Sequence, residues 1–90
     1  MITIYKYPLQ TTDLQTLQIT GFMKVLSVAL QREQIVLYCM TNPDAEVEHL
    51  LDVRIMGTGH PAKAVKTWDF NGTVSMHGGD LMFHVFTELR

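Results

Sequence analysis

The 90-residue chain has few of the residues that cross-link or charge a small protein. It contains one cysteine, Cys39, so no disulfide can form within the chain and a reducing compartment is expected. Seven basic residues against nine acidic ones give a net charge of −2, which predicts no binding of extended nucleic acid because such binding needs a basic face. No apolar run approaches the roughly 18–20 residues that span a bilayer, and no signal peptide is visible. A cytoplasmic protein with no membrane partner is expected.

What the chain does have is an apolar surplus, with 47% hydrophobic residues. A single domain over residues 1–90 buries only a modest core. Apolar side chains that find no place inside must pack elsewhere, and self-association is their usual outlet. The composition therefore predicts a homo-oligomer.

Alternating apolar and polar residues predict a mainly β fold, or a β-rich α+β fold. Short strands are expected at residues 2–7, 14–19, 24–31, 34–41, 49–56, 73–77 and 80–89. Turns are expected at Arg32-Glu33, 42–46, Asn71-Gly72 and Gly78-Gly79. These six or seven mostly antiparallel strands fit a small sandwich or a small barrel. One short helix is expected near 61–68, with Pro61 in its first turn.

The stretch RIMGTGHPAK, residues 54–63, carries the main candidate site. Its two glycines leave backbone amides accessible, and a helix beginning at Pro61 would direct its first amides and its dipole at the same place. The stretch matches neither GxxxxGK[ST] nor GxGxxG. Two interpretations stay open: an anion-binding loop, or glycines that only supply positive φ for a turn. The expected ligand-binding residues are Arg54, Gly57, Thr58, Gly59, His60, Lys63 and Lys66, with Tyr5, Tyr7 or Trp68 stacking on a base.

Nucleophilic catalysis has little support in the sequence. Cys39 lies in an apolar run, where a thiol is inert, and no serine lies in a nucleophile-elbow motif. Asp52 has Arg54 as a neighbour on the same face of its strand, which predicts a surface ion pair. The sequence predicts a protein that is not an enzyme and that has no cofactor.

The four histidines do not have metal-binding spacing, since no pair is separated by four residues on a helix or forms an HxH pair on a strand. A metal site would need His60, His77 and His84 to meet in three dimensions with a carboxylate such as Asp80. His84 is instead expected to be a hydrogen-bonded core or interface residue. No metal site is predicted.

Several short motifs resemble those of a family of small, largely uncharacterised domain proteins encoded by phages and prophages. The matching segments cover most of the chain and are Ile4–Leu9 (IYKYPL), Asn42–Glu46 (NPDAE), Gly57–His60 (GTGH), Gly72–Val74 (GTV) and Gly78–Phe86. The resemblance implies a phage origin and a host-cell cytoplasmic setting. The resemblance does not identify any catalytic residue in this chain.

Small phage proteins of this size often counter host defence, and two modes are common among them. The first is a sponge, an oligomer that sequesters a cyclic-nucleotide-like anionic signal. The second is a protein–protein inhibitor that blocks a host defence complex directly. The glycine-rich loop with its nearby cations, the aromatic residues and the apolar surplus favour the sponge, and the inhibitor is the alternative.

Overall fold

The computed structural model describes residues 1–90 and is built almost entirely of β-strands. The strands are β1 (Thr3–Pro8), β2 (Leu14–Thr20), β3 (Phe22–Gln31), β4 (Gln34–Thr41), β5 (Glu48–Gly57), β6 (Asp69–Met76) and β7 (Leu81–Leu89). Three single 3₁₀ turns, η1 (Pro43–Ala45), η2 (Lys63–Val65) and η3 (His77–Gly79), connect some of them. Every strand pair is antiparallel, so the expected mainly β fold with seven short strands is confirmed.

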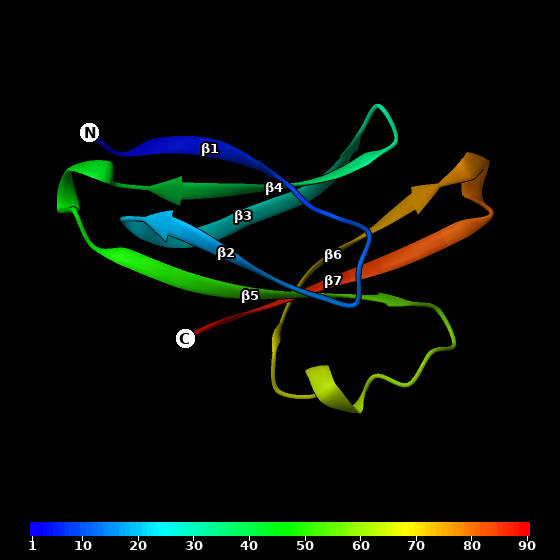
Figure 1. Ribbon diagram of the computed structural model, residues 1–90. Coiled ribbons are helices and arrows are strands. Elements are labelled where there is room, and N and C mark those ends of the chain that lie inside the picture. Colours follow the sequence, from blue (N-terminus) through cyan, green and yellow to red (C-terminus); the bar gives the residue numbers. More distant parts are fainter.

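The strands form two sheets. One has three strands in the order β1-β4-β3, and the other has four in the order β2-β5-β7-β6. Figure 1 shows them as two layers, with the three-stranded sheet above the four-stranded one. Of the two expected architectures, this arrangement is a sandwich. The edge strands β3 and β6 belong to different sheets and lie against each other, which brings the two layers together along one seam.

The tight hairpin expected between β3 and β4 is present, although its turn lacks the residues that hairpins prefer. Arg32 and Glu33 both have positive φ, 50° and 62°. Two left-handed residues match the right-handed twist of the flanking strands, which is why asparagine and glycine are usual there. The apolar strands on either side determine the register, and the turn residues accept the strained conformation.

The hydrophobic core fills the space between the sheets, as strand alternation requires. It is built from Leu9, Ile19, Ile35, Leu37, Cys39, Leu51, Val53, Ile55, Val74, Met76 and Val85. Burial raises the pKa of the Cys39 thiol to about 11, so this thiol is protonated at neutral pH. Because Leu51, Val53 and Ile55 point inward from β5, Asp52 and Arg54 between them lie on the opposite, outer face of the four-stranded sheet.

The helix expected over residues 61–68 does not form, and that prediction is wrong. Only the 3₁₀ turn η2 lies within these residues. A two-turn helix is marginal unless an apolar face packs against the protein, and here Val65 alone is buried. No helix in the structure has the length and apolar character needed to cross a membrane.

The turn expected at Asn71-Gly72 is also wrong, because both residues lie inside β6. The pairing of β6 with β7 shifts by one residue between Phe70 and Gly72, so Asn71 is the extra residue of a β-bulge. Gly72 has a φ of 145°, and a Cβ atom there would lie 2.6 Å from Cγ1 of Val28. Glycine therefore serves here to let β6 approach β3 rather than to reverse the chain.

Candidate functional site

The outer face of the four-stranded sheet places a cation and two aromatic rings in one row. Arg54 of β5 is the register partner of Phe86 in β7, and Phe86 is the partner of Phe70 in β6. The two phenylalanine rings contact each other with centroids 5.3 Å apart. Residues 58–68, the loop between β5 and β6, leave the sheet and lie on the side away from the three-stranded sheet (Figure 1). The loop and this face together form the candidate site.

Arg54 is the central residue of this site. Its guanidinium carbon lies 5.4 Å from the centre of the Trp68 ring, a cation–π geometry. The guanidinium forms no ion pair, and its buried Nε has no hydrogen-bond partner among the protein groups. The same side chain lines a cavity of about 330 Å³, the Arg54 cavity, together with Asp13 and His60. An unpaired guanidinium beside a cavity can donate hydrogen bonds to a carboxylate or a phosphate that enters the cavity.

Arg54 is unpaired because Asp52 has another partner, and the expected Asp52–Arg54 ion pair is wrong. Oδ2 of Asp52 accepts a hydrogen bond from Nε of Arg90 at 3.0 Å, and Oδ1 accepts one from the Thr16 hydroxyl at 2.7 Å. These two bonds, with smaller contributions from the charges of Arg90 and Arg54, hold the pKa of Asp52 below its usual value. Arg90 directly follows β7, and its position beside Asp52 depends on the pairing of β7 with β5, which strand alternation does not specify.

The loop is tied to the sheet by His84. The Thr58 hydroxyl lies 2.7 Å from Nε2 of His84, and the Thr73 hydroxyl lies 2.8 Å from Nδ1. A neutral imidazole accepts from one hydroxyl and donates to the other, so both ring nitrogens are satisfied. The expectation that His84 is hydrogen-bonded is confirmed, and its place is on the outer face beside the loop.

Replacing His84 by phenylalanine is expected to loosen the loop without unfolding the sandwich. The variant keeps a ring but loses both hydrogen bonds, each of which contributes about 0.5–1.5 kcal/mol. Amide hydrogen exchange of residues 58–68 should become faster, while exchange in β5 and β7 stays slow. Thr16→Val is the matched control, because it also removes two hydrogen bonds on the same face, one to Asp52 and one from Arg90, and neither partner lies in the loop. Unchanged loop exchange in His84→Phe would show that Val65 and Trp68 alone hold the loop.

The anion-binding nest expected at the glycine-rich segment stays a prediction, and the structure removes two of the features that supported it. The His60 amide already donates to the Gly57 carbonyl at 3.2 Å, and no helix begins at Pro61 to add its dipole. The His60 ring packs over Gly57, where a Cβ would lie 2.8 Å from the ring. Of the loop glycines, Gly59 alone has positive φ, 86°. Gly59 thus provides the positive φ of the turn, Gly57 allows the close approach of the His60 ring, and Arg54 is the nearest cation on the sheet.

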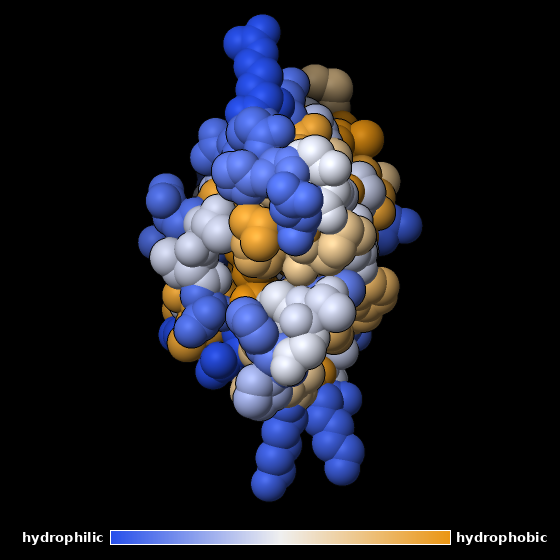
Figure 2. Space-filling view, turned by 90° about the vertical axis from the view of Figure 1, so that its right-hand side faces the viewer, coloured by the Kyte–Doolittle hydropathy of each residue, from blue (hydrophilic) through white to orange (hydrophobic).

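His60 separates two cavities at this end of the molecule. Besides the Arg54 cavity, it lines a second cavity of about 230 Å³ with Thr58 and Asp80. Figure 2 shows this end of the sandwich, with hydrophilic groups protruding at the top and bottom and hydrophobic groups between them. Lys63 and Lys66 are exposed in and beside η2 and line neither cavity. The two lysines add positive charge near the cavities but do not form part of the cavity walls.

Two of the expected site residues lie elsewhere. Tyr5 and Tyr7 belong to β1 in the three-stranded sheet, where they are the register partners of the core residues Cys39 and Leu37. Tyr7 is packed against the core, and burial raises its pKa. The structure therefore brings Arg54, Thr58, His60 and Trp68 together and leaves the two tyrosines on another part of the molecule.

Sequence reasoning missed three contributors to the site. Asp13 precedes β2 and reaches the Arg54 cavity because β2 pairs with β5. Phe86 and Thr73 come from β7 and β6, whose positions beside β5 depend on the sheet order. Alternation along 80–89 did place Met82, His84 and Phe86 on one face, and that was the only available signal. No three histidine, cysteine or carboxylate side chains lie close enough together to hold a metal ion.

Over residues 1–90 the chain matches the family model described as Domain of unknown function (DUF7352). No curated protein and no solved structure matches the chain.

Proposed function

We propose that this chain, which belongs to the family described as Domain of unknown function (DUF7352), is a non-enzymatic binding protein for a small nucleotide-like anion. In this proposal the Arg54 guanidinium binds the phosphate group. His60 and the exposed Lys63 and Lys66 add donors and positive charge around it. An aromatic ring of the same face stacks on the base.

The observation that carries the proposal is the unpaired guanidinium of Arg54. No carboxylate pairs with this guanidinium, and a hydrogen bond from a charged guanidinium to a phosphate contributes about 1.5–3 kcal/mol. The Arg54 cavity of about 330 Å³ lies within the range of small-molecule sites, about 300–1,000 Å³. Asp13 also lines this cavity, and its carboxylate opposes a second phosphate there, so the proposal places one phosphate of the nucleotide beside Arg54 and the rest outside the cavity.

The aromatic residues around Arg54 supply the stacking surface that a base needs. Phe70 is 58% exposed and adjoins Phe86 in the row that begins at Arg54. Stacking of a base on such a ring contributes about 1–3 kcal/mol. Trp68 is half-buried under the guanidinium, so it positions Arg54 and leaves Phe70 as the ring that a base can reach.

The proposed oligomer is supported by the outer face of the three-stranded sheet. Ile4 of β1 and Met40 of β4 are register partners on that face, and Ile4 is 57% exposed. Met23 and Leu26, both exposed, lie at the two irregularities in the β3 register. An exposed apolar surface of this kind favours association between copies.

The biological setting in the proposal comes from the family resemblance noted in the sequence. A phage protein in the host cytoplasm that sequesters a cyclic-nucleotide signal would act by binding alone, as a sponge. The exposed apolar face of the three-stranded sheet favours the alternative as well, an inhibitor that contacts a host defence complex directly.

The experiment is a thermal-unfolding screen of the purified protein against a panel of cyclic di- and trinucleotides. A ligand at 100 times its Kd stabilises the fold by about 2.7 kcal/mol, which raises the Tm by roughly 10–20 °C in a domain of this size. Bound nucleotide is then released by heating and identified by chromatography, and size-exclusion light scattering gives the mass of the particle.

The outcomes are distinct. Recovery of intact nucleotide from an oligomer supports sequestration, whereas a chemically altered nucleotide would mean that the protein is an enzyme. No stabilisation by any member of the panel contradicts the sponge and leaves the inhibitor as the function to test. A strict monomer contradicts the oligomeric part of the proposal.

A further inference from the structure

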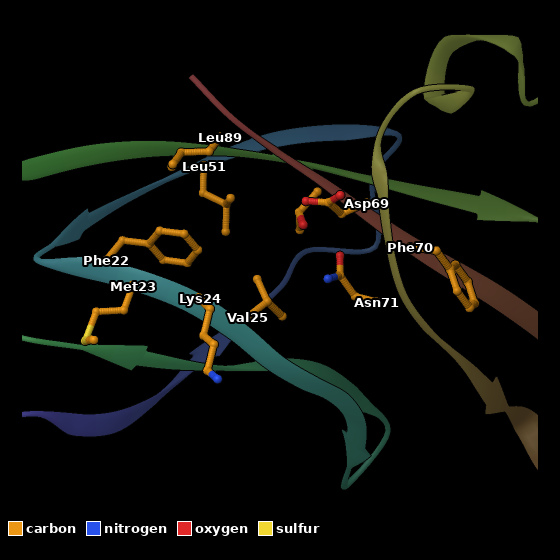
Figure 3. Close-up of a pocket in the computed structure, with 10 residues that line it drawn as sticks. Phe22, Met23, Lys24, Val25, Leu51, Asp69, Phe70, Asn71 and Leu89 are labelled. Carbon is orange, nitrogen blue, oxygen red and sulfur yellow. The ribbon is translucent and has the colours of Figure 1, made fainter.

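The largest cavity in the molecule lies away from the Arg54 site, at the seam where β3 meets the four-stranded sheet. Its volume is about 540 Å³, and we call it the seam cavity. Figure 3 shows its walls, with side chains from β3 on one side and from β5, β6 and β7 on the other. Phe70 lines this cavity and also ends the row that begins at Arg54, whereas Asp69 and its register partner Thr87 line the cavity from the inner side of the sheet.

One part of the seam cavity is apolar. Phe22 and Val25 of β3 face Leu51 of β5 and Leu89 of β7 across it. Leu51 belongs to the core, Phe22 and Val25 pack against it, and Leu89 is exposed at the open edge. This wall fits the hydrocarbon part of a ligand and provides no hydrogen bond.

The opposite part of the seam cavity presents oxygen acceptors without donors. Oδ1 of Asn71 is buried and has no hydrogen-bond partner among the protein groups. The Asp69 carboxylate forms no ion pair. Figure 3 shows the Asp69 and Asn71 side chains extending from β6 into the cavity. The buried Thr87, the register partner of Asp69, lines the same region.

No protein cation neutralises this group of acceptors. Lys24 lines the cavity with its stem, but Figure 3 shows its ammonium group directed away from Asp69 and Asn71. The β-bulge at Asn71 produces the arrangement, because the extra residue turns a second oxygen toward the side that Asp69 already faces. A carboxylate and an unpartnered amide oxygen that line the same cavity are best satisfied by a group that donates several hydrogen bonds and carries positive charge.

We propose that the seam cavity binds a small molecule with a primary ammonium group on an apolar body. The ammonium lies between Asp69 and Asn71, and the hydrocarbon part lies against Phe22 and Leu51. An anion would meet the unneutralised Asp69 carboxylate, so the seam cavity and the Arg54 cavity select ligands of opposite charge. This inference does not depend on the proposed function.

The test uses phenethylamine as the probe, with 2-phenylethanol and phenylacetate as neutral and anionic analogues of similar size. Titrations are followed by the amide chemical shifts of the whole chain. Phenethylamine is expected to shift amides of β3 and β6 around the seam cavity and to bind at least about tenfold more tightly than the other two, as one charge-assisted hydrogen bond provides. Equal affinities for the three probes, or no binding, would overturn the proposal.

Asp69→Asn tests the role of the carboxylate. Asp69 is exposed at one side, so this substitution leaves the core intact. We expect the affinity for phenethylamine to fall by about tenfold and that for 2-phenylethanol to stay the same. Glu88→Gln is the matched control, since it removes a carboxylate from the outer face of β7 and should change neither affinity. Unchanged phenethylamine affinity in Asp69→Asn would overturn the proposed role of the charge.

Discussion

Gly21→Ala is expected to destabilise the sandwich more than any other single-methyl change. Gly21 lies between β2 and β3, where the chain crosses from one sheet to the other. Its amide donates to the Val47 carbonyl at 2.6 Å, and its carbonyl accepts from the Asn42 amide at 2.7 Å. A Cβ atom at position 21 would lie 1.8 Å from the backbone oxygen of Asn42, and φ is +65°.

Two costs combine at this position. An alanine held in the left-handed region costs about 1–2 kcal/mol, and forced overpacking costs about 1–3 kcal/mol more. A chain of 90 residues has a total stability of about 5–13 kcal/mol, so the variant loses a large share of it. Urea unfolding of the wild type and the variant measures the loss directly.

Gly78→Ala separates the two costs. Gly78 has a φ of +67°, nearly the same as Gly21, but a Cβ there would meet nothing within 4 Å. It should therefore lose only the backbone contribution, about 1–2 kcal/mol. Equal losses in the two variants would show that the chain around Asn42 shifts to accommodate the new methyl group.

Arg54→Met is expected to abolish most of the nucleotide binding while leaving the fold as stable as before. Methionine keeps an unbranched chain of similar length beside Trp68 but has no donor. Losing hydrogen bonds to a charged group should weaken binding by about 10–100-fold. The lost cation–π contact costs about 0.5–1 kcal/mol, and removal of the unpartnered Nε returns about 1–3 kcal/mol.

Loss of binding without loss of stability makes this variant informative, and calorimetric titration with thermal unfolding measures both. Lys6→Met is the control, because it removes one positive charge from β1 of the other sheet and should leave the affinity unchanged. Arg54→Lys should also weaken binding, since an ammonium does not reproduce the planar donors of a guanidinium. If Arg54→Met binds the nucleotide with wild-type affinity, the proposed role of Arg54 in phosphate binding is wrong.

The strands were largely predictable from the sequence, and the departures from prediction share one physical cause. The segments at 34–41 and 49–56 have apolar side chains at alternate positions, and this period determines their conformation locally. Asn71-Gly72 has the strongest local turn signal in its region, yet it forms a bulge because pairing with β7 and close approach to Val28 outweigh it. Residues 61–68 have helix-compatible composition but too little apolar surface to hold a helix in place.

For the candidate site, the sequence identified Arg54, His60 and Trp68 but assigned the anion-binding role mainly to backbone amides. Which amides are free depends on the turn at Gly57, and the sequence does not specify that turn. Arg54 is left unpaired because Arg90, which lies 36 positions after Arg54 in the chain, pairs with Asp52. The freedom of the amides and the pairing of Arg54 both depend on contacts in the folded structure that the sequence does not specify.

The sequence by itself thus determined the β class, the strand segments and the face on which Arg54 lies, because side-chain alternation acts over neighbouring residues. The tertiary structure alone decided the sheet order and the freedom of the Arg54 guanidinium. It also decided the separation of Tyr5 and Tyr7 from the loop and the place of Asp69 and Asn71 in one cavity. Each of these depends on contacts between residues far apart in the chain, and such contacts leave no periodic trace in a single sequence.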